Sequence, residues 1–321
     1  MTTFVSLSQN FLTAPVLFFV LGAAAGIVRS NLHFPKGVVQ FLSIYLMMSI
    51  GLKGGIAVAG TGTLTMALLI LIGCGLVYGL LQPVIGFWLL KFTTPLDRPT
   101  RAAVSAHYGS ISVVTFAAAV SWLDSRHLPY AGVVVAIVAL MEAPAIVSGL
   151  MLARENTKNH SPLHILSETL TNGAVFLLLG AFIIGALIGP QQAEKLKGFV
   201  FEPFQGLLCL FLLEMGLTVS RNLKQLSKFT LPLLAFGIYM PLIGAALGIV
   251  TGTLLSLDYG TAYLFTVLCA SASYIAVPAA MRAALPEADP AVYVPLSIGV
   301  TFPFNILIGL PLYGWLLTAA S

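Results

Sequence analysis

Ten apolar stretches, divided by charged residues or by proline and glycine, dominate this chain. A helix that crosses the hydrocarbon core of a bilayer needs about 20 apolar residues, and each stretch is near that length. The stretches lie near residues 12–28, 38–58, 64–90, 102–121, 131–152, 172–189, 199–218, 231–254, 260–281 and 291–318. We therefore predict an all-α polytopic membrane protein with ten transmembrane helices embedded in a lipid bilayer.

Composition supports this class and excludes others. Charged residues are only 8% of the 321 residues and hydrophobic residues 58%, whereas a soluble domain carries about 25% charged residues. This excludes a disordered chain, a nucleic-acid-binding protein and a disulfide scaffold. The sequence has no HExxH, GxSxG or phosphate-binding loop motif, and its three cysteines have no metal-site spacing. We predict that the protein is not an enzyme and has no cofactor. If it moves a solute against a gradient, the energy must come from an ion gradient.

The distribution of basic residues predicts the orientation in the membrane. Lys and Arg are concentrated in the loops that follow the odd-numbered helices. Because cytoplasmic loops carry an excess of these residues, the odd loops are expected in the cytoplasm and both termini outside.

Short sequence matches recur at a nearly constant offset and predict an internal repeat. They divide the chain into a first five-helix repeat (1–152), a cytoplasmic linker (153–171) and a second repeat (172–321). Because each half has an odd number of helices, the second must be inverted relative to the first, as in many secondary transporters. The matches pair Leu21-Gly22-Ala23 with Leu179-Gly180-Ala181, Gly51-Leu52 with Gly216-Leu217, Asp97-x-x-Thr100 with Asp258-x-x-Thr261, and Ser105-Ala-x-Tyr108 with Ser271-Ala-x-Tyr274.

Helices 4 and 9 hold the densest polar segments within the membrane, around Ser105–Thr115 and Cys269–Pro278. Polar groups at that depth are costly and tend to face a cavity or a functional site. We expect Gly109 and Pro278 to break these helices, since proline removes a backbone donor. A break exposes the positive end of one half-helix, which suits a small anion, and carbonyl and hydroxyl oxygens, which suit Na⁺. The alternative is that small residues only let the helices pack closely.

Several other polar residues lie inside the apolar stretches. Glu142 is near the middle of helix 5, and the repeat places Thr301 at the corresponding point of helix 10, with Asn305 close by. A carboxylate there is suited to Na⁺ or to a proton, and otherwise to a structural hydrogen bond. His107 is a candidate proton carrier, and with Tyr108 it is equally suited to hydrogen bonds between helices.

Three segments resemble the signatures of the sodium-dependent bicarbonate transporter family, known from cyanobacteria and many other bacteria. They are AAVSAHYGSISVVTFAAA at 102–119, MEAPAI at 141–146 and SASYIAVPAAMR at 271–282. The resemblance covers essentially the whole chain. It implies ten helices in an inverted repeat, Na⁺-coupled symport of bicarbonate into the cell by alternating access, a homotrimer, and a place in the bacterial plasma (inner) membrane. Helices 3–5 and 8–10 would move as a core against helices 1, 2, 6 and 7.

The resemblance also implies site residues. Bicarbonate would meet Gly109, Ser110, Ser112, Ser271 and Ser273. The coupling ion, Na⁺, would lie against Ser105, Glu142, Ser273 and Thr301.

Two features depart from the family pattern. Cyanobacterial members carry an acidic residue where this chain has Tyr274, so the choice between Na⁺ and H⁺ as coupling ion stays open. Their linker between the halves is longer than residues 153–171, which weakens the case for a PII-like regulator as a partner. The alternatives are a proton- or sodium-coupled carrier of another small organic anion and a passive anion channel.

Overall fold

The structure, a computed structural model, describes residues 13–61, 65–153, 173–227 and 229–320. All regular secondary structure in these ranges is helical. The predicted linker lies outside them, apart from Ala153.

Seven helical segments of the described chain are long and apolar enough to cross a membrane. They are Lys36–Gly60, Met66–Thr93, Arg98–Ser125, Val133–Ala153, Phe176–Arg221, Leu231–Leu254 and Pro290–Ala319. Two shorter apolar helices are Ala14–Ile27 and Tyr259–Cys269. The segment Phe176–Arg221 is 46 residues long and contains two of the expected spans. The protein is therefore a polytopic helical membrane protein.

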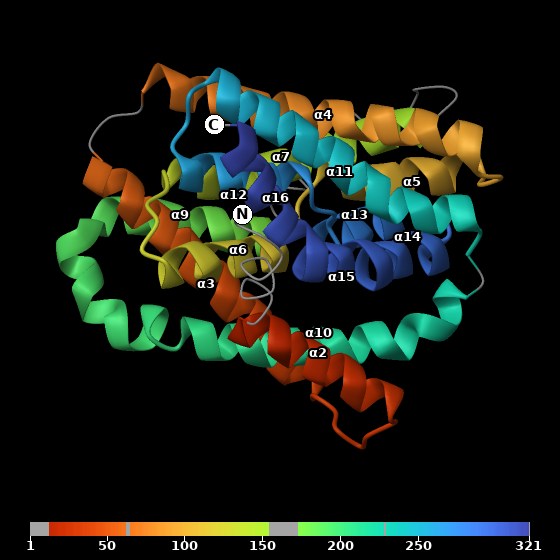
Figure 1. Cartoon of the computed structure of the whole chain (residues 1–321), viewed down its shortest axis with the longest axis horizontal. Helices are drawn as coiled ribbons and strands as arrows, with labels where there is room; N and C mark the ends of the chain where they lie inside the picture. The colour runs from red at the N-terminus through yellow and green to blue at the C-terminus, as the bar shows by residue number, and fades with distance from the viewer. Residues whose placement is uncertain (1–12, 62–64, 154–172, 228, 321) are drawn as a thin grey trace.

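The helices follow one another in the order that the apolar stretches predict (Figure 1). The first half contains α2 (Ala14–Ile27), α3 (Lys36–Thr61), α4 (Met66–Thr93), α5 (Arg98–Gly109), α6 (Val113–Ser125) and α7 (Val133–Ala153). The second half contains α9 (Gly173–Ala193), the short turns η1 (Glu194–Leu196) and η2 (Lys197–Phe201), α10 (Phe204–Leu226), α11 (Leu231–Leu254), α12 (Tyr259–Cys269), α13 (Ala276–Ala284), α14 (Pro290–Leu296), η3 (Ser297–Thr301), α15 (Phe302–Phe304), η4 (Asn305–Gly309) and α16 (Leu310–Ala320).

Helix starts follow from local sequence. Asp97 and Asp258 are the N-cap residues of α5 and α12, and the Asp258 carboxylate accepts a hydrogen bond from the backbone N–H of Thr261 at 2.9 Å. Asp289 caps α14 in the same way, with Pro290 as its first helical residue. Such caps satisfy backbone N–H groups that have no partner within the helix.

Two helices are interrupted within the membrane. The predicted break at Gly109 is confirmed, since α5 ends there and α6 begins at Val113. In the second half α12 ends at Cys269 and α13 begins at Ala276. Pro278 is not the break: it is the third residue of α13, where its missing N–H has no intrahelical acceptor to lose. Residues 102–121 and 260–273, which contain most of both interruptions, are all buried.

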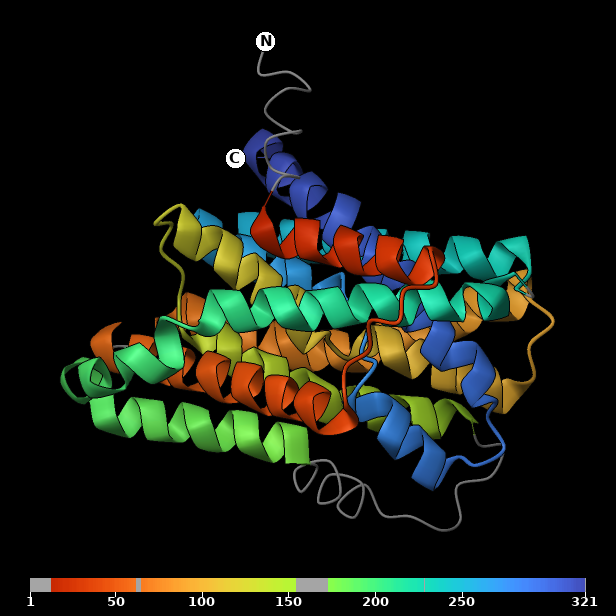
Figure 2. The ribbon, with the colours of Figure 1, turned by 90° about the horizontal axis from the view of Figure 1, so that it is seen from below.

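Two pairs of helices cross closely at glycines. α2 packs on α10, and α3 packs on α9, as both views show (Figures 1 and 2). A Cβ added to Gly216 of α10 would lie 2.6 Å from the backbone nitrogen of Ala23, and one added to Gly51 of α3 would lie 2.8 Å from Cβ of Ala181. Small residues allow this close approach, which is a common way to pack helices in membranes.

The interrupted helices lie between these pairs and α4 and α11, which run along the opposite side of the molecule (Figure 1). α4 packs on α5 and α7, and α11 packs on α12. Many large apolar side chains on the outer helices are exposed, among them Phe92, Leu187, Leu231 and Leu254 at 77–80%. Because a soluble protein rarely leaves so much apolar surface uncovered, these outer faces suit contact with lipid.

Candidate functional site

The two interruptions touch each other through backbone hydrogen bonds. The backbone N–H of Ser112 donates to Oγ of Ser271 at 3.0 Å, and that of Ser273 donates to the carbonyl oxygen of His107 at 2.8 Å. The interruption between α12 and α13 is thus joined both to the interruption between α5 and α6 and to the last turn of α5.

The N-caps of α5 and α12 offer one alignment of the two halves. If Asp97 and Asp258 are equivalent, Ser110-x-Ser112 aligns with Ser271-x-Ser273. In this alignment Ser105 and Tyr108 do not pair with Ser271 and Tyr274. Ser105 and Tyr108 lie within α5, whereas Ser271 and Tyr274 lie in the interruption. The polar segment Ser105–Thr115 is divided between two helices.

Serine side chains cap the two half-helices that start at the crossing. Oγ of Ser112 accepts hydrogen bonds from the backbone N–H and the hydroxyl of Thr115 at 3.1 and 2.9 Å. Oγ of Ser273 accepts one from the backbone N–H of Val277 at 3.4 Å. The N-termini of α6 and α13 therefore both lie at the crossing, where their backbone N–H groups and dipoles favour an anion.

A narrow cavity, the central crevice, lies at this crossing. It is lined by Met47, Ile111, Ser112, Val113, Glu142, Ser273, Tyr274, Ile275 and Ala276. Beside its wall, Ser110 is 1% exposed and its hydroxyl has no hydrogen-bond partner. Oε2 of Glu142, which is 4% exposed, is likewise without a partner. Since a buried polar group without a partner is costly, these two atoms mark a place where a ligand would be stabilised.

Of the residues that the structure describes, Glu142 is the one acidic residue that lines the crevice. It comes from α7, one residue from the middle of the helix. A buried carboxylate is tolerated when it is neutralised or paired, and an oxygen-rich setting of carboxylate, hydroxyls and carbonyls suits Na⁺. Within the described ranges no group of three His, Cys, Asp or Glu side chains could hold a metal ion, so a transition-metal centre is not indicated there.

The other two expected cation ligands lie elsewhere. Oγ of Ser105 donates to the carbonyl oxygen of Arg101 at 2.7 Å. The hydroxyl of Thr301 donates to the carbonyl oxygen of Gly237 in α11 and bonds with the Tyr108 hydroxyl, both at 2.7 Å. The structure therefore brings Glu142 and Ser273 together in the crevice, and places Thr301 with Tyr108 against α11.

His107 and Asn305 hold backbone segments on either side of the crossing. Nδ1 of His107 donates to the carbonyl oxygen of Ala103 at 2.6 Å, so its other ring nitrogen, Nε2, carries no proton in the neutral ring. Nδ2 of Asn305 donates to the carbonyl oxygen of Ala270 at 2.8 Å, and its Oδ1 accepts from the Tyr313 hydroxyl at 2.7 Å. Asn305 thus fixes the end of α12.

Gly109 is required by close packing against α4. A Cβ at this position would collide with the ring of Pro83 and lie 2.7 Å from the carbonyl oxygen of Gly79. In the second half the glycine is on the long helix instead: a Cβ on Gly244 of α11 would collide with the backbone of Cys269 and lie 3.2 Å from Cα of Ala270, at the end of α12. Each interruption is therefore next to a close approach of a neighbouring long helix, α4 or α11.

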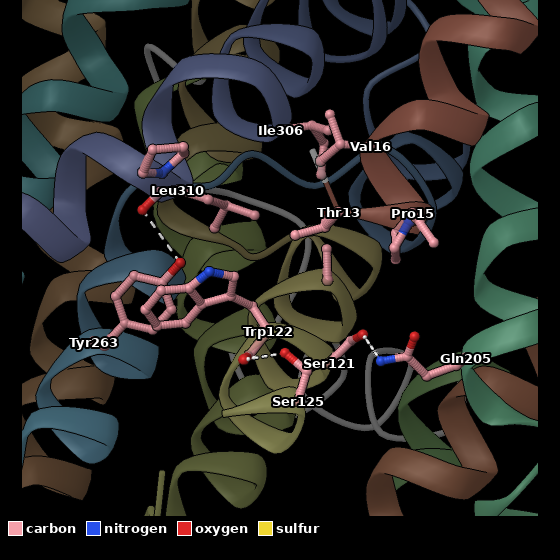
Figure 3. A pocket seen from close by; sticks show the side chains of 13 residues that line it. Thr13, Pro15, Val16, Ser121, Trp122, Ser125, Gln205, Tyr263, Ile306 and Leu310 are labelled. Carbon is pink, nitrogen blue, oxygen red and sulfur yellow. Dashed lines mark hydrogen bonds between the residues drawn. The ribbon is translucent and has the colours of Figure 1, made fainter. Parts of the chain in front are cut away.

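A second cavity, the Trp122 pocket, was not predicted from the sequence. It lies between α2 and α10 on one side and α6, α12, η4 and α16 on the other, with a volume of about 190 Å³ (Figure 3). It is lined by Thr13, Ala14, Pro15, Val16, Ala118, Ser121, Trp122, Ser125, Gln205, Tyr263, Ile306, Leu310 and Pro311. The sequence feature that points to this region is Trp122, at the end of an apolar stretch. A tryptophan at that place is equally typical of an anchor at the membrane interface, so it does not predict a pocket.

Comparison with known proteins identifies a family. A sequence model of the Na⁺-dependent bicarbonate transporter superfamily matches residues 14–318, which include the crossing, Glu142, the central crevice and the lining of the Trp122 pocket except Thr13. A search of curated proteins gives no match.

Proposed function

The chain belongs to the Na⁺-dependent bicarbonate transporter superfamily, and we propose that it is a symporter that couples bicarbonate uptake to the entry of Na⁺. The observation that carries this proposal is the central crevice. There the N-termini of two half-helices and a buried carboxylate lie together, and an unpartnered serine hydroxyl, that of Ser110, lies beside the wall.

The anion would bind at the crossing. Gly109, Ser110, Ser112, Ser271 and Ser273 would surround it. The backbone N–H groups at the start of α6 and α13 would donate to its oxygens, and the hydroxyl of Ser110 would complete the set. The geometry supports this because three of these serines are already within hydrogen-bond distance of the opposite interruption or of a helix N-terminus.

Glu142 gives a physical reason for coupling. An ionised carboxylate in the same crevice repels a bicarbonate ion, and low local polarity strengthens that repulsion. A Na⁺ ion held by Glu142 and Ser273 would remove it, so that each ion favours the binding of the other. Ser105 and Thr301, whose hydroxyls are engaged near α4 and α11, would join this cation only after the core rearranges.

Alternating access would use an inverted repeat of two five-helix halves, 1–152 and 172–321. Two structural correspondences support it: Asp97 and Asp258 both begin the helix that is later interrupted, and the α2–α10 and α3–α9 crossings use sequence-matched positions. We call α2, α3, α9 and α10 the scaffold and the remaining helices the core, and propose that the core moves against the scaffold.

The family and the charge distribution support the remaining proposals. These are a bacterial inner-membrane location with both termini outside, ten transmembrane helices and a homotrimer. The short linker of residues 153–171 does not favour a PII-like regulator.

Proton coupling is a second candidate mechanism, because Oε2 of Glu142 has no partner and a protonated carboxyl would also remove the repulsion. His107 supports it less, since its ring packs on Tyr293 with centroids 4.9 Å apart and it is absent from the crevice lining. A channel would also pass an anion, but it cannot accumulate one against a gradient.

Uptake of labelled bicarbonate into proteoliposomes distinguishes these functions. Accumulation with an inward Na⁺ gradient, and none when K⁺ replaces Na⁺, is the expected result. The double variant Ser110→Ala/Ser273→Ala should abolish it. Ser148→Ala removes a buried serine that bonds Leu80 instead, and should leave uptake intact. Uptake that persists without Na⁺ and requires a proton gradient would show proton coupling, and equilibration without accumulation would show a channel.

A further inference from the structure

The Trp122 pocket and the central crevice are separated by a short row of aromatic rings. The rings of Phe19 and Phe302 meet edge to face with centroids 5.5 Å apart, and the rings of Phe302 and Tyr274 meet with centroids 5.4 Å apart. Phe302 is 2% exposed and therefore has contacts on all sides.

One end of this row lines the central crevice, and the other lies about one helical turn from the lining of the Trp122 pocket. Val16 and Ile306 line the Trp122 pocket, and they lie about one helical turn from Phe19 and Phe302 respectively. Tyr274 lines the central crevice. Phe302 thus stands between a pocket that is partly open to the surface and the proposed substrate site.

The row also joins the scaffold to the core. Phe19 belongs to α2 of the scaffold, whereas Phe302 and Tyr274 belong to the core. Around the pocket, Nε2 of Gln205 in α10 donates to Oγ of Ser121 in α6 at 2.7 Å, which Figure 3 shows. These contacts would break if the core moved away from α2 and α10.

The rim of the pocket suits a small anion. Gln205 is exposed there, and its amide carries a second N–H donor besides the one that bonds Ser121. The guanidinium of Arg126 stacks on the Trp122 ring, 4.4 Å from its centroid, and brings a positive charge beside the opening. The end of α6 faces outside in the orientation that the basic loops predict.

We propose that the Trp122 pocket is the outer entrance through which the substrate anion reaches the central crevice, and that the side chain of Phe302 is the gate between them. The proposal deepens the proposed transport function and rests on it. Separation of Phe302 from Phe19 opens the entrance, and their contact closes it.

Cysteine labelling tests the gate without transport. An anionic, membrane-impermeant thiol reagent is applied to intact cells that express Ala118→Cys, in the pocket, or Ala276→Cys, in the crevice, and the parent chain with Cys74, Cys209 and Cys269 gives the background. We expect Ala118→Cys to react readily and Ala276→Cys slowly. Adding Phe302→Ala should accelerate labelling of Ala276→Cys by about tenfold, because two aromatic contacts are lost.

Matched variants separate gating from general loosening. Phe265→Ala removes a fully buried ring that packs on Tyr78 and should leave labelling of Ala276→Cys slow. Phe302→Leu keeps apolar bulk and serves if Phe302→Ala does not fold. Equal labelling of Ala276→Cys with and without the Phe302 substitutions, or an Ala118→Cys that stays unreactive, would overturn the proposal.

A transport readout then connects the gate to the substrate. Modification of Ala118→Cys with a bulky thiol reagent should stop bicarbonate uptake, while modification of Thr253→Cys, on the exposed side of α11, should not. If labelling behaves as expected but no anion is taken up, the gate stands and the proposed substrate is wrong. Uptake that continues at full rate in the blocked Ala118→Cys protein would refute the entrance.

Discussion

The backbone N–H of Ser112 donates to the side-chain oxygen of Ser271, 159 residues away in the sequence. Oγ of Ser271 in turn donates to the carbonyl oxygen of Leu268 at 3.0 Å. One buried hydroxyl therefore serves a donor from the first half of the chain and an acceptor from the second, and it fixes the distance between the two interruptions.

Replacing Ser271 with alanine should lower stability and transport together. The variant leaves the buried N–H of Ser112 without its acceptor, which costs about 1–3 kcal/mol. Thermal unfolding of the purified protein in detergent measures this loss. Ser125→Ala, which removes an exposed hydroxyl bonded only within its own helix end, is the control. An unchanged unfolding temperature for Ser271→Ala would show that water or another group replaces the hydroxyl.

Gly109→Ala should be among the most damaging single-methyl additions in the chain. Its Cβ would meet the Pro83 ring and the carbonyl oxygen of Gly79, so α5 must move away from α4. Overpacking of this kind costs about 1–3 kcal/mol. Gly180→Ala adds the same methyl where no atom lies within 4 Å, and should be neutral or slightly stabilising. Expression level and unfolding temperature distinguish the two, and a tolerated Gly109→Ala would contradict the packing argument.

The structural features that depend on residues close together in the chain could be predicted from the sequence. Apolar length predicts the membrane helices, and the dense polar segment predicts the interruption next to Gly109. The prediction for Pro278 was wrong, because the sequence does not distinguish a proline in the first turn of a helix from a proline that breaks a helix. The position of α13 decides between them, and that position depends on packing.

Contacts between distant residues were beyond the sequence for a similar reason. Tyr108 and Thr301 were both candidates, but nothing in their spacing says that their hydroxyls meet at 2.7 Å. The Trp122 pocket is assembled from five separate parts of the chain. Such a surface has no local pattern, so periodicity and motifs cannot indicate it.

Glu142→Gln should abolish the response to Na⁺ while the protein stays folded. The amide keeps the shape of the side chain but removes the charge that would hold the cation. Na⁺ should raise the unfolding temperature of the parent protein, because a ligand that binds only the folded state stabilises it, and it should not do so for Glu142→Gln. Choline chloride at equal ionic strength controls for salt. A Na⁺-dependent rise that persists in Glu142→Gln would place the cation elsewhere.

Asn305→Leu should destabilise the end of α12, because it removes the hydrogen bond from the Asn305 side chain to Ala270. The leucine cannot donate to the carbonyl oxygen of Ala270 or accept from the Tyr313 hydroxyl, so two buried groups lose their partners. We expect a loss of several-fold in the maximal uptake rate and a lower unfolding temperature. Tyr313→Phe removes only the outer hydrogen bond and should have a smaller effect, of about 1 kcal/mol. If Tyr313→Phe were the more harmful change, Asn305 would not be the residue that holds Ala270.

Lys53 and Asp124 form an ion pair between α3 of the scaffold and α6 of the core, with Nζ and Oδ2 2.8 Å apart. Their side chains are 19% and 38% exposed, so water weakens the attraction and the pair should contribute at most about 1 kcal/mol to stability.

The ion pair should have a larger effect on transport, because a moving core must separate the two charges. In a double-mutant cycle with Lys53→Met and Asp124→Asn, unfolding temperatures should change little. The uptake rates of the two single variants should change by factors that do not multiply in the double variant, since the residues act as a pair. Independent effects on uptake would show that this contact does not distinguish one state of the transporter from another.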